Sequence, residues 1–477
     1  MAINEVTLAR LHGAVGDRGM IVDPGEMTSY VTDHRQLFTG TAAAILRPAT
    51  TEETAAVMTI CAETGTSVVP QGGNTGLVGG SVPDATGDSV VLNLGRMNKV
   101  REIDSLNNTM TVEAGCILAE LQSAATDADR LFPLSLGAEG SCMIGGNLST
   151  NAGGVQVLKF GNARDLVLGL EVVLPDGRVW PALNALRKDN TGYDLKHLFI
   201  GAEGTLGIIT AAVLKLFPRP AQVETALLAV PELDHVLKLM ADARAVSGDG
   251  VTAFELLPRI GIEMVLKHFE GTRPPLETVS PWYVLMEWST GDSGEKAGTN
   301  TGLRRVLEAF LEGGFKAGLV VDAVLASSEA QAKELWYFRE VLPEAQTREG
   351  GSIKHDVSVP VSAVAEFIRE GTRLLEADME GIRVFPFGHV GDGNIHFNVS
   401  QPVAMTKDDF YTSWQNMNRI IHDLVMRMEG SFSAEHGIGR LKREDLAYYG
   451  EPLDLELMYR IKAALDPQGI MNPGKVI

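Results

Sequence analysis

The stretch from residue 385 to 399 constrains the fold most, because it has the pattern of two β-strands joined by a tight turn. Asp392-Gly393 lies between two runs of alternating side chains. Asp-Gly is typical of a two-residue hairpin loop, since glycine accepts the positive φ that a type I′ turn demands. In that register His389 faces His396. The two imidazoles would then project from one sheet face with Cβ atoms roughly 5 Å apart, close enough to share a metal ion.

A later carboxylate, Glu435, completes a candidate metal site with His389 and His396. Two histidines and one carboxylate leave coordination positions open, which is typical of catalytic metal sites. Nitrogen and oxygen ligands suit Zn, Mn or Fe, and we expect Zn. The alternative is that both histidines fill a polar sheet face, but the adjacent Glu435-His436 pair favours the metal. Asn398 shares the strand face of His396. It could contact the substrate or a metal ligand, or it could be an ordinary strand asparagine.

Composition excludes several classes of function. A chain of 477 residues predicts two or three domains, and a net charge of −20 argues against nucleic acid or an anionic membrane as a partner. The three cysteines, Cys61, Cys116 and Cys142, are scattered, and Cys-x-x-Cys is absent. This pattern indicates a reducing compartment without disulfides or an iron–sulfur cluster. With no signal-peptide pattern and no apolar run long enough for a transmembrane segment, we expect a cytoplasmic protein.

Glycine-rich loops dominate the first 210 residues. A strand at 44–48, a helix at 51–63 and a strand at 66–70 predict a β-α-β unit, which leads into five glycines within residues 72–80. Such a loop exposes backbone N–H groups that can wrap a pyrophosphate, although it is neither a G-x-G-x-x-G nor a Walker motif. Alone, it is equally a chain of tight turns. Two further loops, at 137–154 and 201–209, both contain Gly-Ala-Glu-Gly, so we expect several loops to bind one long dinucleotide.

The second half predicts another α/β domain. Its strand-like runs and helical patterns lie at 223–230, 233–245, 254–256, 282–288, 302–313 and 317–326. A further amphipathic helix is expected at 412–429.

The chain as a whole resembles the FAD-linked D-2-hydroxyacid dehydrogenases of the vanillyl-alcohol-oxidase type, also called the p-cresol-methylhydroxylase type. The segments that carry the resemblance are Pro70–Pro83, Gly137–Gly154, Gly192–Thr210, Phe387–Asn398, Ser433–Gly439 and Met471–Lys475. The resemblance implies an α+β fold with a two-part FAD-binding domain at 1–218, an α/β substrate or cap domain with a mostly antiparallel sheet at 219–429, and a C-terminal segment at 430–477 that returns to the FAD domain. Some relatives carry the flavin on a histidine of the first loop. Asn74 stands in this loop without a histidine, which implies non-covalent FAD.

The residues that the resemblance assigns to FAD lie in the three loops and at the C-terminus. They are Gln71, Gly72, Gly73, Asn74, Thr75, Gly76, Gly79, Gly80, Gly137, Ser141, Gly145, Gly146, Asn147, Thr150, Asn151, Gly153, Gly154, Glu203, Gly204, Gly207, Ile208 and Asn472.

The resemblance is strongest to the hydroxyglutarate branch, which implies D-2-hydroxyglutarate as substrate, with D-malate as a second candidate. Arg339 and Lys354 match residues that contact substrate carboxylates, and His436 is expected to contact the substrate and act as general base for hydride transfer to flavin N5. Relatives can carry a hydroxyl residue four positions after this arginine, where this chain has Pro343. A hydrogen bond made by that hydroxyl would be missing.

Other functions stay open from the sequence alone. Within the enzyme class they are a D-lactate dehydrogenase and the flavin subunit of glycolate oxidase. A flavin-free metallohydrolase would use the same histidines and glutamate, and a non-catalytic flavin-binding subunit of a larger complex is a third class. Since no haem or cluster motif is present, we expect an external electron acceptor, such as an electron-transfer flavoprotein or a quinone pathway, and a homodimer.

Overall fold

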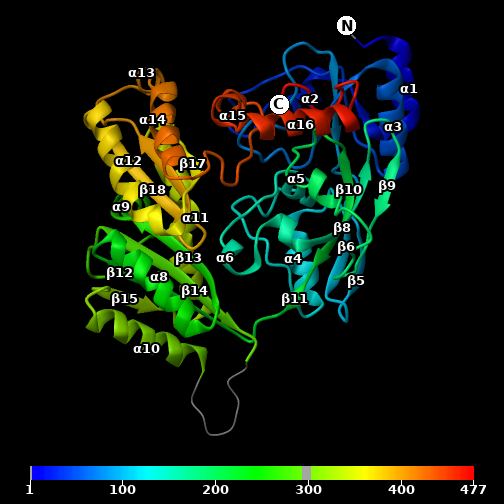
Figure 1. The fold of residues 1–477 in the computed structure, drawn as a ribbon. Helices are drawn as coiled ribbons and strands as arrows, with labels where there is room; N and C mark the ends of the chain where they lie inside the picture. Colours follow the sequence, from blue (N-terminus) through cyan, green and yellow to red (C-terminus); the bar gives the residue numbers. More distant parts are fainter. Residues whose placement is uncertain (1–2, 293–301) are drawn as a thin grey trace. The chain divides into compact units, whose positions relative to one another are not determined.

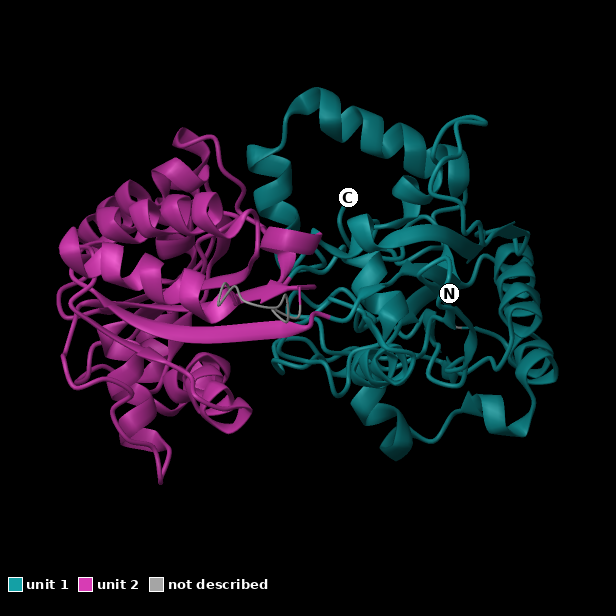
Figure 2. Ribbon diagram, turned by 90° about the horizontal axis from the view of Figure 1, so that it is seen from below, with its two compact units in different colours: residues 1–153, 161–219, 435–477 teal, residues 154–160, 220–434 magenta. Residues whose placement is uncertain are grey.

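The computed structural model describes residues 3–292 and 302–477 (Figure 1). Two units follow from its contacts: unit 1 comprises residues 1–153, 161–219 and 435–477, and unit 2 comprises residues 154–160 and 220–434 (Figure 2). The segments at 154–160 and 430–434 thus lie in unit 2. The domain borders expected at 218 and 429 stay predictions.

The first part of unit 1 is a small, mostly parallel sheet of order β1-β2-β4-β3. Both β2 (Ala44–Leu46) and β3 (Ser67–Gln71) run parallel to β4 (Ser89–Asn93), which lies between them. Helix α3 (Thr51–Thr64) connects β2 to β3; Thr50 accepts the amide of Glu53 at its start, and Gly65 ends it with φ 64°. The predicted strand–helix–strand unit is therefore present, with β4 inserted between its strands.

A second, antiparallel sheet completes unit 1, with order β5-β6-β10-β8-β9. Its strands are β5 (Val100–Asp104), β6 (Thr109–Glu113), β10 (Ile208–Lys215), β8 (Val167–Val173) and β9 (Val179–Ala182). Two short strands pair antiparallel to others: β1 (Met20–Ile21) with β2, and β7 (Arg130–Leu131) with β11 (Phe217–Pro218). The other helices of unit 1 are α1 (Glu5–Val15), α2 (Pro24–Val31), α4 (Leu118–Asp127), α5 (Ile144–Ser149), α7 (Lys196–Phe199), α15 (Arg443–Tyr449) and α16 (Pro452–Leu465).

The C-terminal segment closes the edge of the parallel sheet. Val68 in the edge strand β3 donates its amide to the carbonyl of Ile470 and accepts the amide of Asn472, both at 2.8 Å. Lys462 on α16 donates to the carbonyls of Thr205 and Met471 at 2.7 and 2.8 Å. The end of the chain therefore covers backbone groups that a bare edge strand would expose.

Unit 2 is built on an eight-stranded sheet of order β15-β12-β14-β13-β18-β19-β16, with β17 also paired to β19. Every pair in it is antiparallel, as the sequence predicted for most of them. The strands are β12 (Gln222–Val230), β13 (Val251–Pro258), β14 (Trp282–Thr290), β15 (Asp322–Leu325), β16 (Ser352–Ile353), β17 (Asp356–Ser358), β18 (Arg383–His389) and β19 (Asn394–Ser400).

Helices cover both faces of this sheet (Figure 1). Strand alternation sends Leu228 into a core with α8, α10, α12 and α14, and Leu227 into a second core with α9 and α11. This double burial explains the continuous apolar runs at 226–230 in β12 and 282–286 in β14. The helices are α6 (Val157–Phe160), α8 (Leu233–Ser247), α9 (Arg259–His268), α10 (Leu303–Lys316), α11 (Glu329–Arg348), α12 (Val364–Asp378), α13 (Lys407–Tyr411) and α14 (Trp414–Arg427).

Within the described part of the chain, no helix combines the length and the apolar character that crossing a membrane requires. Cys61, Cys116 and Cys142 are all buried free thiols.

Candidate active site

The hairpin of β18 and β19 forms, but its register differs from the prediction. His389 pairs with Asn394 and Phe387 pairs with His396, so the loop has four residues, 390–393, rather than two. Gly393 has the positive φ, 83°, that requires glycine, whereas Asp392 lacks the positive φ of a type I′ loop. The shift moves His396 by two positions along β18 and therefore keeps both histidines on one face. Their ring centroids lie 5.5 Å apart.

Glu255 on β13 lies behind His389 and was not singled out in the sequence. Its Oε1 is 2.6 Å from His389 Nδ1, and its Oε2 accepts a hydrogen bond from Arg339 Nε at 2.6 Å. Burial alone would raise the pKa of this fully buried carboxyl, but the charges and hydrogen bonds of His389 and Arg339 lower it to about 2. The ionised carboxylate therefore joins one predicted metal ligand to one predicted substrate-binding cation.

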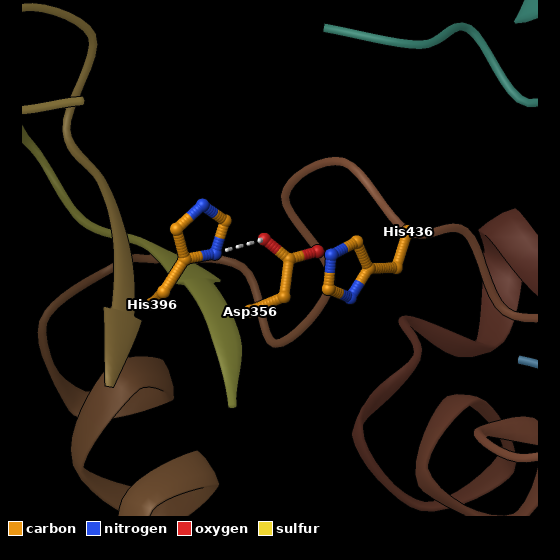
Figure 3. A group of neighbouring side chains, drawn as sticks. All are labelled: Asp356, His396 and His436. Carbon is orange, nitrogen blue, oxygen red and sulfur yellow. Dashed lines mark ion pairs between the residues drawn. The ribbon is translucent and has the colours of Figure 1, made fainter. Parts of the chain in front are cut away.

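Asp356 on β17 occupies the corresponding position beside His396, its partner across the β17–β19 pair. The side chain is almost fully buried, and its Oδ1 lies 3.8 Å from His396 Nδ1 (Figure 3). The same oxygen accepts a hydrogen bond from Asn394 Nδ2 at 3.0 Å. Asp356 therefore lies next to a predicted metal ligand.

Glu435 and His436 follow directly on Ala434, whose amide donates to the carbonyl of Asp356 at 3.3 Å. This backbone contact fixes where the two residues enter the site. The potential ligand atoms of His389, His396 and Glu435 lie within 4.8 Å of one another, as do those of Asp356, His396 and His436 (Figure 3). The structure thus brings the three predicted metal ligands together, and it places His396 in a second possible ligand group with Asp356 and His436.

Three of the predicted substrate-binding residues lie at different places in unit 2, whereas His436 belongs to unit 1. Arg339 projects from α11, with its guanidinium 4.9 Å from the centre of the Phe387 ring, and Lys354 lies between β16 and β17. Asn398 is buried and donates to Gln346 Oε1 at 2.9 Å, so its amide takes part in a core hydrogen-bond network. Pro343 lies inside α11, one turn after Arg339, and has no amide to donate to the Arg339 carbonyl.

A pocket in unit 1 is lined by residues of all three glycine-rich loops. The predicted cofactor residues on its wall are Gln71, Gly72, Gly73, Asn74, Thr75, Gly76, Gly80, Gly145, Gly146, Asn147, Thr150, Glu203, Gly204, Gly207 and Ile208. The other predicted cofactor residues lie outside its lining: Gly79, Gly137, Ser141, Asn151, Gly153, Gly154 and Asn472. His436 also lines this pocket, together with Leu94, Ala114, Cys142 and Met143.

Two observations show that this pocket suits a bound cofactor. A Cβ added to Gly76 or Gly146 would meet no protein atom within 4 Å, so these glycines leave room along the wall. The buried Oδ1 of Asn147 accepts no hydrogen bond within the described structure. A ligand with donor groups would satisfy it. By contrast, Gly73 is required by the protein itself, since its Cβ would lie 2.1 Å from the Ser141 carbonyl oxygen.

Several polar residues of the loops hold the loops themselves. Asn74 adopts φ 53°, donates to the Thr32 carbonyl at 2.8 Å and accepts from Ser81 Oγ at 2.8 Å. Glu203 also has a positive φ, 51°, and its carboxylate accepts amides of the 437–439 turn. Burial raises the pKa of Glu203, and these N–H groups act in the opposite direction. The side chains of Asn74 and Glu203 therefore shape the pocket wall.

Comparison with known proteins covers the whole chain. Residues 219–476 match the C-terminal domain of FAD linked oxidases, and residues 42–182 match an FAD binding domain. The chain is 40% identical to a mitochondrial D-2-hydroxyglutarate dehydrogenase of Bos taurus, over 100% of this chain and 84% of that protein. It is 37% identical to a D-2-hydroxyglutarate dehydrogenase of Xanthomonas citri pv. viticola, over 98% and 96%.

Solved structures share the fold at lower identity. A p-cresol methylhydroxylase with bound substrate aligns at a TM-score of 0.78 and 16% identity, over 99% of this chain and 96% of that one. An alkyldihydroxyacetonephosphate synthase aligns at a TM-score of 0.72 and 16% identity, over 99% and 85%. These likenesses confirm the α+β fold that the sequence resemblance predicted.

Proposed function

Because the chain belongs to the family of FAD-linked oxidases, we propose that it oxidises a D-2-hydroxyacid to the 2-oxoacid, with D-2-hydroxyglutarate as the first candidate and D-malate as the second. The relatives named D-2-hydroxyglutarate dehydrogenase support this substrate, since they match nearly the full chain. Within the structure, the observation that carries the proposal is the Glu255 bridge between His389 and Arg339. A flavin-free metallohydrolase is not supported, because residues 42–182 match an FAD binding domain.

The pocket of unit 1 is proposed to hold FAD without a covalent bond. The space beside Gly76 and Gly146 and the unsatisfied oxygen of Asn147 fit a large ligand with donor groups. FAD supplies the oxidant, since it accepts the hydride that leaves C2 of the substrate. The glycine-rich loops bring backbone N–H groups to the wall, where they bind phosphate oxygens.

His389, His396 and Glu435 are proposed to hold a divalent metal ion, with Zn expected ahead of Mn or Fe. Glu255 accepts from Nδ1 of His389 and leaves Nε2 as the ligand atom, an arrangement typical of metal-bound histidines. When bound, the ion supplies positive charge that binds the substrate carboxylate and lowers the pKa of its 2-hydroxyl.

His436 is proposed as the general base. It lines the cofactor pocket and directly follows the proposed ligand Glu435. Its imidazole accepts the proton of the 2-hydroxyl as the C2–H bond breaks, and the C2–O bond becomes a carbonyl.

Arg339 and Lys354 are proposed to bind the distal carboxylate of a dicarboxylate substrate. Arg339 uses Nε for Glu255, and its two Nη groups have the planar geometry that suits a carboxylate. Since Pro343 replaces a hydroxyl residue, selection of the dicarboxylate depends on these two cations. An external acceptor, such as an electron-transfer flavoprotein or a quinone pathway, a homodimeric state and a cytoplasmic location complete the proposal.

A substrate screen with a dye acceptor tests this function. We expect D-2-hydroxyglutarate and D-malate to be oxidised faster than D-lactate and glycolate. Arg339→Ala should raise KM for the dicarboxylates by roughly 10-fold or more while D-lactate changes little, because a lost charged hydrogen bond costs about 1.5–3 kcal/mol. Arg348→Ala on the same helix, which pairs with the exposed Glu344, is the matched control. Equal dicarboxylate preference in Arg339→Ala and the parent would refute the substrate assignment.

A further inference from the structure

Glu203 joins four segments of unit 1 through its backbone and side chain. Its amide donates to the carbonyl of Ser149 at the end of α5, and its carbonyl accepts from Asn472 Nδ2, each at 2.8 Å. Its carboxylate accepts the amides of Ile438 and Gly439, each at 2.7 Å and each on a separate oxygen. One buried residue thus connects the cofactor loops, the C-terminus and the turn that follows Glu435 and His436.

The turn at residues 437–439 is shaped around this carboxylate. Gly437 has φ 78° and Gly439 has φ 50°, and a Cβ on Gly437 would lie 2.7 Å from Glu203 Oε1. On its far side the turn is held by Arg440, whose amide donates to the Val78 carbonyl at 2.9 Å. Consecutive backbone N–H groups in such a turn form a concave anion site, and here Glu203 is the anion.

A carboxylate is the side chain that this turn requires. Two amides point at it simultaneously, and only a carboxylate offers two acceptor oxygens without a competing donor. Glutamine would turn an NH2 group toward one of the amides and leave that buried N–H without an acceptor, which destabilises the turn. The local sequence does not dictate this role. In the other Gly-Ala-Glu-Gly segment, the Glu139 carboxylate accepts the amide of Leu136, three residues away, at 3.1 Å.

We propose that Glu203 is a positioning residue that fixes the turn at 437–439 and thereby holds Glu435 and His436 in place for metal binding and proton transfer. This inference rests on the proposed function for the roles of Glu435 and His436. Only Gly437 separates His436 from Ile438, the nearer of the two residues whose amides are bonded, so loosening the turn frees both side chains. A role in binding the flavin would predict a different outcome, namely loss of FAD.

Hydrogen exchange of the Glu203→Gln holoenzyme tests whether Glu203 fixes the turn at 437–439. Glu139→Gln, in the other Gly-Ala-Glu-Gly segment, is the control. In Glu203→Gln we expect the peptide spanning residues 433–442 to exchange faster, while FAD absorption stays at the parent level. Metal content after dialysis should fall, with a dissociation constant raised roughly 10–100-fold, the usual effect of losing an outer-shell partner. Added metal should restore part of kcat. Unchanged exchange at 433–442, or loss of FAD in place of loss of metal, would overturn the proposal.

Gly437→Ala tests the same contact from the other side if Glu203→Gln does not fold. Its Cβ would push against Oε1, and we again expect faster exchange and metal loss with FAD retained. Normal metal affinity in both variants would also overturn the positioning role. A parent enzyme that binds no metal and oxidises no hydroxyacid would refute the proposed function and the catalytic half of this inference, while the exchange comparison would still decide the hold on the turn.

Discussion

Glu255 shows how one buried charge can organise several residues. It is completely buried on β13, and its two oxygens contact His389 and Arg339. With its pKa lowered to about 2, it stays ionised at neutral pH. Because Glu255 contacts Nδ1 of His389, Nε2 would be the nitrogen left for a metal ion. Arg339 is held by the same group, so the proposed metal ligand and the proposed substrate contact share one anchor.

Replacing Glu255 with glutamine should therefore weaken both functions. The neutral amide leaves the largely buried Arg339 without a counter-charge, and breaking a buried pair costs about 3–5 kcal/mol. We expect a lower Tm and a metal dissociation constant raised at least about 10-fold. Thermal unfolding and metal analysis measure the two effects. Glu344→Gln, at an exposed pair with Arg348, should change neither. Parent-like metal affinity in Glu255→Gln would contradict the anchor role.

Glu349 should make the stability of the protein depend on pH in the acid range. Burial alone would raise its pKa, but hydrogen bonds from Lys267, His268 and Arg383 lower it to about 2, from an ordinary value of 4.5. A lowered pKa in the folded state means that the stabilisation is complete above pH about 4.5 and is lost as pH falls toward 2. We expect Glu349→Gln to be less stable than the parent at pH 6 and nearly equal to it at pH 2. Urea unfolding across this range measures the difference, and a constant gap would contradict the assignment.

At the level of elements, the hairpin shows what a turn motif can and cannot predict. Gly393 was correctly identified as a turn glycine, yet the loop has four residues. Both two-residue and four-residue loops use a glycine with positive φ, so the motif alone does not separate them. His389 and His396 still share one face, as predicted, because the register differs from the prediction by two residues, an even number. No local sequence pattern around Glu255 indicated that it belongs to the site. It lies 134 residues from His389, and only pairing of β13 with β18 brings the two together.

The short helix α6 supports the same hairpin from outside. Its segment, 154–160, leaves the cofactor loops and packs in unit 2 against β13 and the hairpin loop. A Cβ on Gly391 would lie 2.7 Å from Leu158 Cδ2. Gly391 therefore leaves the space that Leu158 fills.

Gly391→Ala should destabilise the protein by about 1–3 kcal/mol, the usual cost of overpacking a filled site. Leu158→Ala in the same chain should recover part of that loss, because the two residues are in direct contact. Chemical unfolding of both single variants and the double variant gives the coupling. Gly313→Ala, on α10 with nothing within 4 Å of the new Cβ, should instead be neutral or stabilising. Additive losses in the double variant would rule out this contact.

For the whole molecule, the sequence predicted the succession of elements and the fold better than the way in which distant segments combine. The strand–helix–strand unit was recognised by periodicity, which is a local property, and the antiparallel sheet was implied by the family resemblance. The placing of β4 between β2 and β3, and of residues 154–160 in unit 2, depends on contacts between distant segments. Periodicity carries no information on such contacts, so it did not indicate that residues 154–160 pack with unit 2.

Chelation is a test on the intact protein. The residues that line the cofactor pocket and the three proposed metal ligands form separate sets. Treatment with a chelator should therefore abolish dye reduction while the flavin absorption spectrum remains. Activity should return on adding Zn, Mn or Fe, and the most effective ion identifies the metal. Full turnover by metal-free protein would refute the metal role.

The backbone bonds of Val68 to Ile470 and Asn472 have a consequence for biosynthesis. They connect positions about 400 residues apart, so at roughly 5–20 residues per second a ribosome needs about 20–80 s to deliver the partner of this strand. During that interval the β3 edge is exposed to pairing with other nascent chains. The half of the protein that is synthesised first is thus completed last, and its yield in a cell should depend on the chaperones that protect it until translation ends.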